Sequence, residues 1–241
     1  MKIDKRLQEF SLVWKKKRVL RAVYSNYYQR ILNACCVGRT LEVGGGTGNL
    51  KGFASDIISI DILAAPWLDV VCDAQRLPFQ GGAFSNIVMF DVLHHIDNVT
   101  LFFSEVERIL CPGGRLVCLE PAITLGSWLF YNFLHHELVD MTQDPLQPIE
   151  SDIKDPYDSN QAIPTLLFRK HPERFQAAFP NLRLSKTEYL SLLAYPLSGG
   201  FQRWSLIPER LVEPLLKLEN RLLPVLGRWL AFRLLAVVER C

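Results

Sequence analysis

Short apolar runs alternate with helical segments through the middle of the chain. Each run is rich in Val, Ile and Leu and is bounded by Gly, Pro or Asp. Strands of this composition are typical of a parallel sheet covered on both faces, because neither face then needs polar residues. The expected strands lie near residues 39–43, 57–61, 69–72, 86–90 and 115–120. The pattern predicts an α/β fold with helices on both faces of the sheet.

The segment before these strands, residues 5–36, has helical periodicity. Tyr24, Tyr27 and Tyr28 fall one turn apart on one of its faces. An aromatic stripe of this kind commonly packs against a sheet. We therefore expect an N-terminal helix that contacts the core.

The alternation stops after residue 120. Residues 121–163 begin apolar and aromatic, between Trp128 and Leu134, and then become polar with several prolines. A connection of this length in a compact domain usually serves binding. It follows the fifth expected strand, so we interpret it as a lid over the carboxyl end of the sheet.

The C-terminal part resumes regular structure. The pattern predicts a helix at 171–179, a sixth strand at 182–190 and a mostly helical Leu-rich segment at 207–230. Three prolines in the Leu-rich segment are expected to start or bend helices. The last apolar run, residues 232–239, fits either a continued helix or another strand.

Composition narrows the class of protein. A length of 241 residues with 49% hydrophobic residues suits one domain with a large core. A net charge of +2 gives no overall attraction to nucleic acid, and the basic run Lys15–Arg18 is either a solvated face or a contact with a partner. Six cysteines without metal-ligand spacing favour a reduced, cytoplasmic protein. We expect neither a secretory signal nor the apolar stretch of about 18 residues that a membrane-spanning helix needs.

The first strand leads into a glycine-rich turn. Glu42 is followed by Gly44, Gly46 and Gly48, and the second strand ends at Asp61. Glycines at such a turn let a ligand approach the backbone. The dinucleotide fingerprint needs another glycine where Asn49 stands, which argues against a nicotinamide cofactor.

This acid-glycine turn resembles the first motif of class I S-adenosylmethionine-dependent methyltransferases. Three later segments resemble further motifs of that family in the expected order: Leu68–Phe79, Phe84–His95 and Glu105–Glu120. The last segment is similar to the small-molecule branch that includes quinone-biosynthesis methyltransferases. Cys111 stands where that branch usually has Lys, in a surface turn. The resemblance covers roughly residues 38–120 and fades beyond Pro121.

The resemblance implies a Rossmann-like fold with a seven-stranded, mostly parallel sheet. Its seventh strand would be antiparallel and inserted beside the fifth, which favours a strand for the last apolar run. It also suggests that the N-terminal helix covers the cofactor. The implied organisation is one domain with a helical cover (1–37), a cofactor-binding core (38–120), an acceptor lid (121–163) and a completion of the sheet with Leu-rich helices (164–241).

Cofactor contacts follow from the same resemblance. The glycines, Gly45 included, would line the methionine part of S-adenosylmethionine. Asp61 would bind the ribose, with Ile62 beside it, and Asp73 with the Ala74 backbone would read the adenine. Glu42 would fix the loop or meet the cofactor's amino group through water, and Asp91 would face the methionine part or the acceptor. The alternative is a purely structural role, in which Asp61 and Asp73 form turns at strand ends.

Methyl transfer from a sulfonium is an in-line displacement, so positioning and exclusion of water supply much of the acceleration. The expected general bases are His94 and His95, which follow the fourth strand. A metal site in the lid, built from His135, His136, Glu137 and Asp140, is a less favoured alternative. We predict no metal.

The leading hypothesis is a methyltransferase for a small acceptor, bulky or lipid-linked, because the lid is aromatic and the C-terminal segment is rich in Leu and Arg. That segment either covers the sheet or also rests on a membrane surface. The main alternative is an inactive cofactor-binding or partner protein of the same fold. Nucleic-acid methylation is disfavoured, because Asp91–His94 lacks the Pro-Pro-aromatic motif of base-amine methylation. The oligomeric state is left open.

Overall fold

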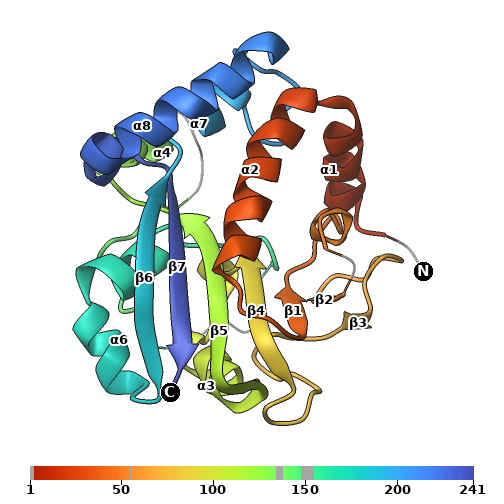
Figure 1. Cartoon of the computed structure of the whole chain (residues 1–241), viewed down its shortest axis with the longest axis vertical. Coiled ribbons are helices and arrows are strands. Elements are labelled where there is room, and N and C mark those ends of the chain that lie inside the picture. The colour runs from red at the N-terminus through yellow and green to blue at the C-terminus, as the bar shows by residue number, and fades with distance from the viewer. Residues whose placement is uncertain (1–2, 55, 134–137, 148–154) are drawn as a thin grey trace.

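The computed structural model describes residues 3–54, 56–133, 138–147 and 155–241. In these ranges seven strands form one sheet in the order β3-β2-β1-β4-β5-β7-β6 (Figure 1). The strands are β1 Thr40–Val43, β2 Ile57–Asp61, β3 Val70–Val71, β4 Phe84–Phe90, β5 Leu110–Pro121, β6 Leu182–Leu190 and β7 Arg233–Arg240. Strands β1 to β5 pair in parallel, whereas β7 pairs antiparallel with both β5 and β6. The predicted Rossmann-like architecture is confirmed, and the last apolar run is a strand.

Strand β5 begins earlier than expected. Leu110 pairs with Phe84 of β4, and the regular register then resumes at Asn86 and Arg115 after an irregularity. The turn around Gly113, whose φ is +75°, lies inside this interval. The sequence pattern starts the strand only after this turn because proline and glycine normally interrupt strands.

One face of the sheet is covered by α2 (Arg18–Ala34), α7 (Ala194–Ser198) and α8 (Val212–Leu230). The buried stripe of α2 runs from Val19 to Ile31 and contains all three predicted tyrosines. Tyr24, Tyr27 and Tyr28 contact the ring of Phe90 at the end of β4. The aromatic stripe therefore packs against the sheet, as its periodicity predicts.

The other face carries the remaining helices. They are α3 Val99–Ile109, α5 Ile163–Thr165, the π-helical turn η3 Leu166–Lys170 and α6 Pro172–Ala178. Helix α3 begins where the Asn98 side chain accepts a hydrogen bond from the Leu101 N–H, which satisfies an otherwise unpaired donor. Its stripe Phe102, Phe103 and Val106 is fully buried in the core. Helices thus lie on both faces of the sheet.

The N-terminal segment forms two helices instead of one. Helix α1 spans Lys5–Lys16, and Lys17 has an extended backbone before α2 begins. The Lys17 ammonium donates hydrogen bonds to the carbonyl oxygens of Gly200 and Gln202, which ties the bend to the loop after α7. Part of the basic run therefore contacts the chain itself.

The glycine turn after β1 leads into a single 3-10 turn, η1 (Leu50–Gly52), where the sequence pattern suggested a helical segment. The interval before β2 begins at Ile57 is short, and Gly52 is a weak helix former. Residues 50–54 therefore make one turn and return to the sheet. The ligand-facing turn is consequently held by loop contacts more than by a helix terminus.

The segment after β5 starts with α4 (Leu125–Phe133), which lies beside α8 at the carboxyl ends of the parallel strands (Figure 1). Two further short elements are η2 (Leu93–His95) after β4 and η4 (Glu209–Leu211) before α8. Pro208 immediately precedes η4 and Pro224 lies inside α8. These are positions at which a proline starts or bends a helix, as expected. In the described part of the chain, no helix has the length and apolar character needed to cross a membrane.

Candidate functional site

One cavity of about 810 Å³ opens at the carboxyl ends of β1, β2 and β4. It is lined by residues from α1, α2, the glycine turn, the strand ends, α4, α7 and the start of β7. The predicted site residues that line it are Glu42, Gly44, Gly45, Gly46, Asp61, Ile62, Asp73, Ala74, Asp91, His94 and His95. Gly48 is absent from the lining. The structure therefore brings together all but one of the residues chosen from sequence.

The positions of the turn require glycine for different physical reasons. Gly44, Gly46 and Gly48 have φ values of +75°, +45° and +72°, which side chains disfavour. A Cβ at Gly44 would lie 2.2 Å from the Val92 side chain, and one at Gly48 would lie 2.6 Å from the Trp67 ring. A Cβ at Gly46 would have no neighbour closer than 3.8 Å. Gly46 is thus the position where the backbone borders open space.

Asp61 fixes this turn from the end of β2. Its carboxylate accepts hydrogen bonds from the N–H groups of Gly46 (2.8 Å) and Leu63 (2.9 Å). Burial raises the pKa of Asp61, and these N–H groups oppose the rise because they stabilise the ionised form. The Trp67 indole N–H donates to the Gly46 carbonyl oxygen at 2.8 Å, on the other side of the same turn. Asp61 therefore shapes the backbone in addition to bordering the cavity.

Asp73 lies two residues after the end of β3 and forms a turn with Gln75. Its Oδ1 accepts from the Gln75 backbone N–H at 2.8 Å. This is the turn-forming role that the sequence offered as the alternative to ligand binding. The two roles coexist, because Asp73 and Ala74 also line the cavity. We call the glycine turn, Asp61 and Asp73 the cofactor cradle.

Glu42 lies beneath the cradle and is 7% exposed. Its Oε2 accepts a hydrogen bond from the Ser59 hydroxyl of β2 at 2.5 Å. Burial raises the pKa of Glu42 to about 7, against the opposing effects of Ser59 and Lys51. The carboxyl group therefore joins β1 to β2 under the turn, which agrees with the loop-fixing role.

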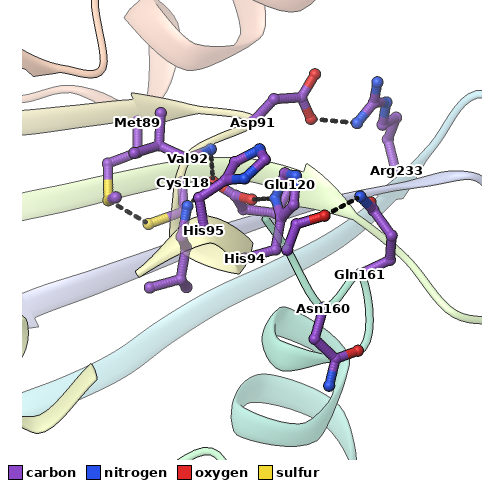
Figure 2. Close-up of polar contacts among 12 residues, drawn as sticks. Met89, Asp91, Val92, His94, His95, Cys118, Glu120, Asn160, Gln161 and Arg233 are labelled. Atoms are coloured by element: carbon purple, nitrogen blue, oxygen red, sulfur yellow. Dashed lines mark hydrogen bonds and ion pairs between the residues drawn. The ribbon is translucent and has the colours of Figure 1, made fainter. Parts of the chain in front are cut away.

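The chain turns sharply after β4. Asp91 has a φ of +57°, an uncommon conformation for a residue with a side chain. Its carboxylate accepts a hydrogen bond from Nη1 of Arg233, the first residue of β7 (Figure 2). The arginine side chain is 2% exposed and the Asp91 side chain 30%, so the ion pair is buried on the side of the arginine.

The next residues are held by Glu120, near the end of β5. Glu120 Oε1 accepts from the backbone N–H groups of Val92 and Leu93, each at 2.9 Å. Its Oε2 lies 2.6 Å from His94 Nδ1 (Figure 2). Burial raises the pKa of Glu120 to about 7, and the two backbone donors oppose the rise. With the hydrogen on Nδ1, Nε2 is the nitrogen of His94 that can take up a proton.

His95 differs from its neighbour. Its Nδ1 lies 3.0 Å from the carbonyl oxygen of Asp158, so this nitrogen donates. Burial and the adjacent His94 lower the pKa of His95 to about 4. His95 is consequently neutral near pH 7 and a weak base. The structure separates the two histidines that the sequence treats alike.

Beyond the strand ends the cavity is walled by aromatic rings. They come from α2, β4, α4 and α7: Tyr24, Phe90, Phe130, Tyr131 and Tyr195. The Arg233 guanidinium lies 4.0 Å from the centre of the Tyr195 ring. We call these five rings with Arg233 the aromatic chamber.

Sequence reasoning missed Glu120, Arg233 and Tyr195. Glu120 carried a usable signal, since an acid at the end of a strand expected to be buried parallels Glu42 at β1. The other two come from segments distant in the chain, whose placement only the folded sheet reveals. Arg233 was noted merely as one of several arginines in a Leu-rich segment.

Two metal-site hypotheses can be compared with the structure. His135, His136 and Glu137 of the lid lie outside the described residues, and Asp140 accepts hydrogen bonds from Thr142. Within the described ranges, ligand atoms of Asp91, His94 and Glu120 lie within 4.8 Å of one another. Arg233 already neutralises Asp91, and Glu120 already accepts three hydrogen bonds. A cation here would compete with a buried guanidinium, so this donor set suits hydrogen bonding better than metal binding.

Comparison with known proteins gives matches of three kinds. Residues 41–118 match a family described as a methyltransferase domain. A ubiquinone/menaquinone biosynthesis C-methyltransferase UbiE from Desulfotalea psychrophila is 42% identical over 50 residues, covering 21% of this chain and 20% of the relative. A demethylmenaquinone methyltransferase from Symbiobacterium thermophilum is 28% identical, with coverages of 39% and 46%. UbiE from Bordetella parapertussis is 28% identical, with coverages of 55% and 65%. The matches span less than two thirds of each of these relatives.

Solved structures extend the similarity of fold over nearly the whole chain. Geranyl diphosphate C-methyltransferase from Streptomyces coelicolor has a TM-score of 0.53 at 12% identity, covering 92% of this chain and 80% of that one. A SAM-dependent methyltransferase from Archaeoglobus fulgidus has a TM-score of 0.50 at 13% identity, with coverages of 92% and 94%. The motif order, the strand order and these matches lead to one conclusion: the chain carries a methyltransferase domain of the class I, S-adenosylmethionine-dependent type.

Proposed function

We propose that this protein transfers a methyl group from S-adenosylmethionine to a small, bulky and partly apolar acceptor. The observation that carries the proposal is the continuity of one cavity from the cofactor cradle to the aromatic chamber, with His94, which Glu120 holds from behind, on its wall. A donor and an acceptor held in these two parts would meet beside the end of β4.

The cradle suits an adenosyl group with an amino-acid tail. The backbone at Gly46 borders open space, Asp61 supplies a carboxylate at the end of β2, and Asp73 supplies another farther along the same edge. Vicinal ribose hydroxyls are donors that a carboxylate binds well. We assign the ribose to Asp61, with Ile62 beside it, and the adenine to Asp73 and the Ala74 backbone.

The chamber contributes position and dryness. In-line displacement requires the sulfur, the methyl carbon and the acceptor atom on one line, with water excluded. Five aromatic rings in the wall help to meet this need. Helix α4, with Phe130 and Tyr131, forms part of that wall, and this supports the acceptor-lid role proposed for residues 121–163.

His94 is the better candidate for a general base. The buried Glu120 carboxyl orients its ring and can stabilise the imidazolium, as a carboxylate does for a catalytic histidine. His95 has a pKa of about 4 and donates its Nδ1 hydrogen to the loop at Asp158. We therefore assign His94 the role of proton acceptor, Glu120 that of positioning residue, and His95 a structural role.

The names of the relatives support a planar acceptor that is methylated on carbon, since several are quinone-biosynthesis C-methyltransferases. The aromatic chamber is compatible with such a ring, because aromatic side chains stack on flat ligands. An apolar tail on the acceptor would leave the chamber beside α4.

The outer surface near the chamber suits contact with anionic lipid. On α8, Leu218, Leu222, Val225 and Trp229 are all exposed and form one stripe at helical spacing. A second exposed stripe, offset around the same helix, consists of Lys217, Arg221 and Arg228. Apolar and basic stripes side by side are typical of helices that rest on bilayers.

Helix α4 continues this apolar surface. Its exposed residues Leu125, Trp128, Leu129 and Phe133 lie opposite the two rings that line the cavity. One helix thus separates the chamber from the proposed lipid contact, which offers a short path for a lipid-linked acceptor. Vesicles containing anionic lipid should sediment with the wild-type protein and not with Val225→Asp/Trp229→Asp. Equal sedimentation of both proteins would exclude this contact.

The cofactor assignment is tested by calorimetry with S-adenosylhomocysteine. Asp61→Ala should weaken its binding by on the order of 1–3 kcal/mol through loss of charge-assisted hydrogen bonds. The matched control is Asp56→Ala, at the amino end of β2 and exposed to solvent. Unchanged affinity in Asp61→Ala would refute the ribose assignment. Absence of binding to the wild type would favour an inactive partner protein of the same fold.

A further inference from the structure

Arg233 is buried in the cavity wall, and its hydrogen-bonding capacity is only partly used. Its side chain is 2% exposed and lines the cavity, yet its Nε–H has no acceptor among the described residues. The contact with Asp91 uses Nη1. A guanidinium carries five donors, and a buried donor without an acceptor is costly. The arginine is therefore arranged to bind something further.

The surroundings of the guanidinium are aromatic and phenolic. It lies 4.0 Å from the centre of the Tyr195 ring and 6.0 Å from that of Phe90. Tyr24, Tyr131 and Tyr195 are all close enough to affect it electrostatically. In such a low-dielectric chamber, an oppositely charged group on a ligand is attracted far more strongly than in water. The Arg233–Asp91 ion pair is the charged part of an otherwise aromatic chamber.

The unused donor of Arg233 shows which kind of acceptor is complementary. Arg233 and Asp91 form an ion pair through Nη1, and this leaves the Nε–H of the arginine for a second acceptor. The proposed cofactor adds a sulfonium cation. An anionic acceptor would be attracted by both cations, the sulfonium and the guanidinium.

We propose that Arg233 binds an anionic oxygen of the acceptor, a phenolate or enolate whose charge is conjugated to the methylated atom. This inference rests on the proposed function and specifies its substrate class. The acceptor's electron pair forms the new bond to the methyl carbon, and the electron pair of the breaking carbon–sulfur bond returns to sulfur. Acceptor anion and sulfonium become neutral in the same step, and methylation on a ring carbon then releases that carbon's proton to His94.

The probe is 4-nitrophenol, whose phenolate absorbs visible light and whose phenol does not. It is titrated over pH with protein saturated with S-adenosylhomocysteine, and the pKa of the bound probe is read from the absorbance. The wild type should hold the phenolate roughly tenfold more tightly than the phenol, as one charge-assisted hydrogen bond provides. Binding of both forms with equal affinity, or of neither, would overturn the proposal.

Variants locate the effect. Arg233→Gln should abolish the preference for the phenolate, whereas Arg228→Gln, a change of the same kind on the exposed face of α8, should retain it. Because Arg233→Gln leaves Asp91 unpaired, the double variant Asp91→Asn/Arg233→Gln keeps the site neutral and should also lack the preference. A preference that persists in the double variant would contradict a role for Arg233. If the wild type binds S-adenosylhomocysteine but shows no preference for the phenolate, this inference alone is rejected and the proposed function stays intact.

Discussion

The cofactor cradle and the aromatic chamber are two halves of one cavity, but they are built differently. In the cradle, the main contacts join residues within about one βαβ unit: Asp61 to Gly46, Trp67 to Gly46, and Glu42 to Ser59. Around the chamber, the segment that follows β4 is joined to β5 and β7 by contacts that span 26 to 142 residues. One half is local along the chain, and the other is assembled by the sheet.

This difference explains why recognition of the cofactor and recognition of the acceptor depend on different kinds of residue. A glycine turn with positive φ angles binds through the backbone, so its requirements are few and recur in many proteins of one fold. The chamber is walled by side chains from α2, β4, α4, α7 and β7, each of which can change independently. Fold and cofactor are therefore shared across a family, whereas the acceptor is decided by residues without a common motif.

The largest expected effect is in the chamber half, because one side chain holds its corner. Glu120→Ala leaves the N–H groups of Val92 and Leu93 and the His94 ring without their acceptor. Each buried unpaired donor costs about 1–3 kcal/mol, so the free energy of unfolding should fall by about 3–5 kcal/mol. Urea denaturation measures the loss.

Glu120→Gln is the matched variant, since its amide oxygen still accepts hydrogen bonds. It should lose about 1–2 kcal/mol, because charge-assisted bonds become neutral ones. Equal losses in the two variants would show that the charged carboxylate with its two acceptor oxygens is required, and that neither the packing volume nor the single amide oxygen of Gln can hold the corner after β4.

The cradle half is expected to break through its backbone. Gly44→Ala combines a positive φ with a Cβ that would lie 2.2 Å from Val92. Gly82→Ala has a similar φ of +68° but no atom within 4 Å of the added Cβ. The control should lower the free energy of unfolding by about 1 kcal/mol through backbone strain. Gly44→Ala should lower it by about 2–4 kcal/mol in all and should abolish binding of S-adenosylhomocysteine. Equal unfolding free energies would mean that Val92 moves aside without cost.

The same contrast accounts for what the sequence could predict. The positions of the central strands, the glycine turn and Asp61 were accessible because they depend on spacing within short segments. The break at Lys17 and the early start of β5 were not, since the first depends on carbonyl groups of residues 200–202 and the second on pairing with Phe84. Arg233 is the clearest case: in the sequence it is one arginine among many, and the antiparallel strand β7 places it beside Asp91.

A pH titration sharpens the comparison within the cradle. The pKa of Glu42 is raised from 4.5 to about 7 by burial, so between these values the native state binds more protons than the unfolded state. The free energy of unfolding should therefore fall as pH rises from about 4.5 to 7. Glu42→Gln keeps the acceptor for Ser59 and should reduce that fall by on the order of 2 kcal/mol.

Glu105 provides a control of opposite sign. Its hydrogen bonds with Arg108 lower the pKa of its carboxyl, so its contribution is lost as pH falls. Glu105→Gln should flatten the acidic side of the stability profile and leave the fall toward neutral pH in place. A Glu42→Gln profile parallel to that of the wild type would mean that Glu42 stays ionised in the fold.

The smallest expected effect concerns the orientation of one carbonyl group. Trp67→Phe removes the hydrogen bond to the Gly46 oxygen and retains an aromatic ring against Gly48. The turn should still form, but the peptide that borders the cavity should be less well ordered. Binding of S-adenosylhomocysteine should therefore weaken by about 1 kcal/mol. Trp128→Phe, on the exposed face of α4, is the matched control and should bind normally. If Trp67→Phe binds as tightly as this control, the contacts of Asp61 alone fix the turn, and the cradle depends on even fewer side chains than its local construction suggests.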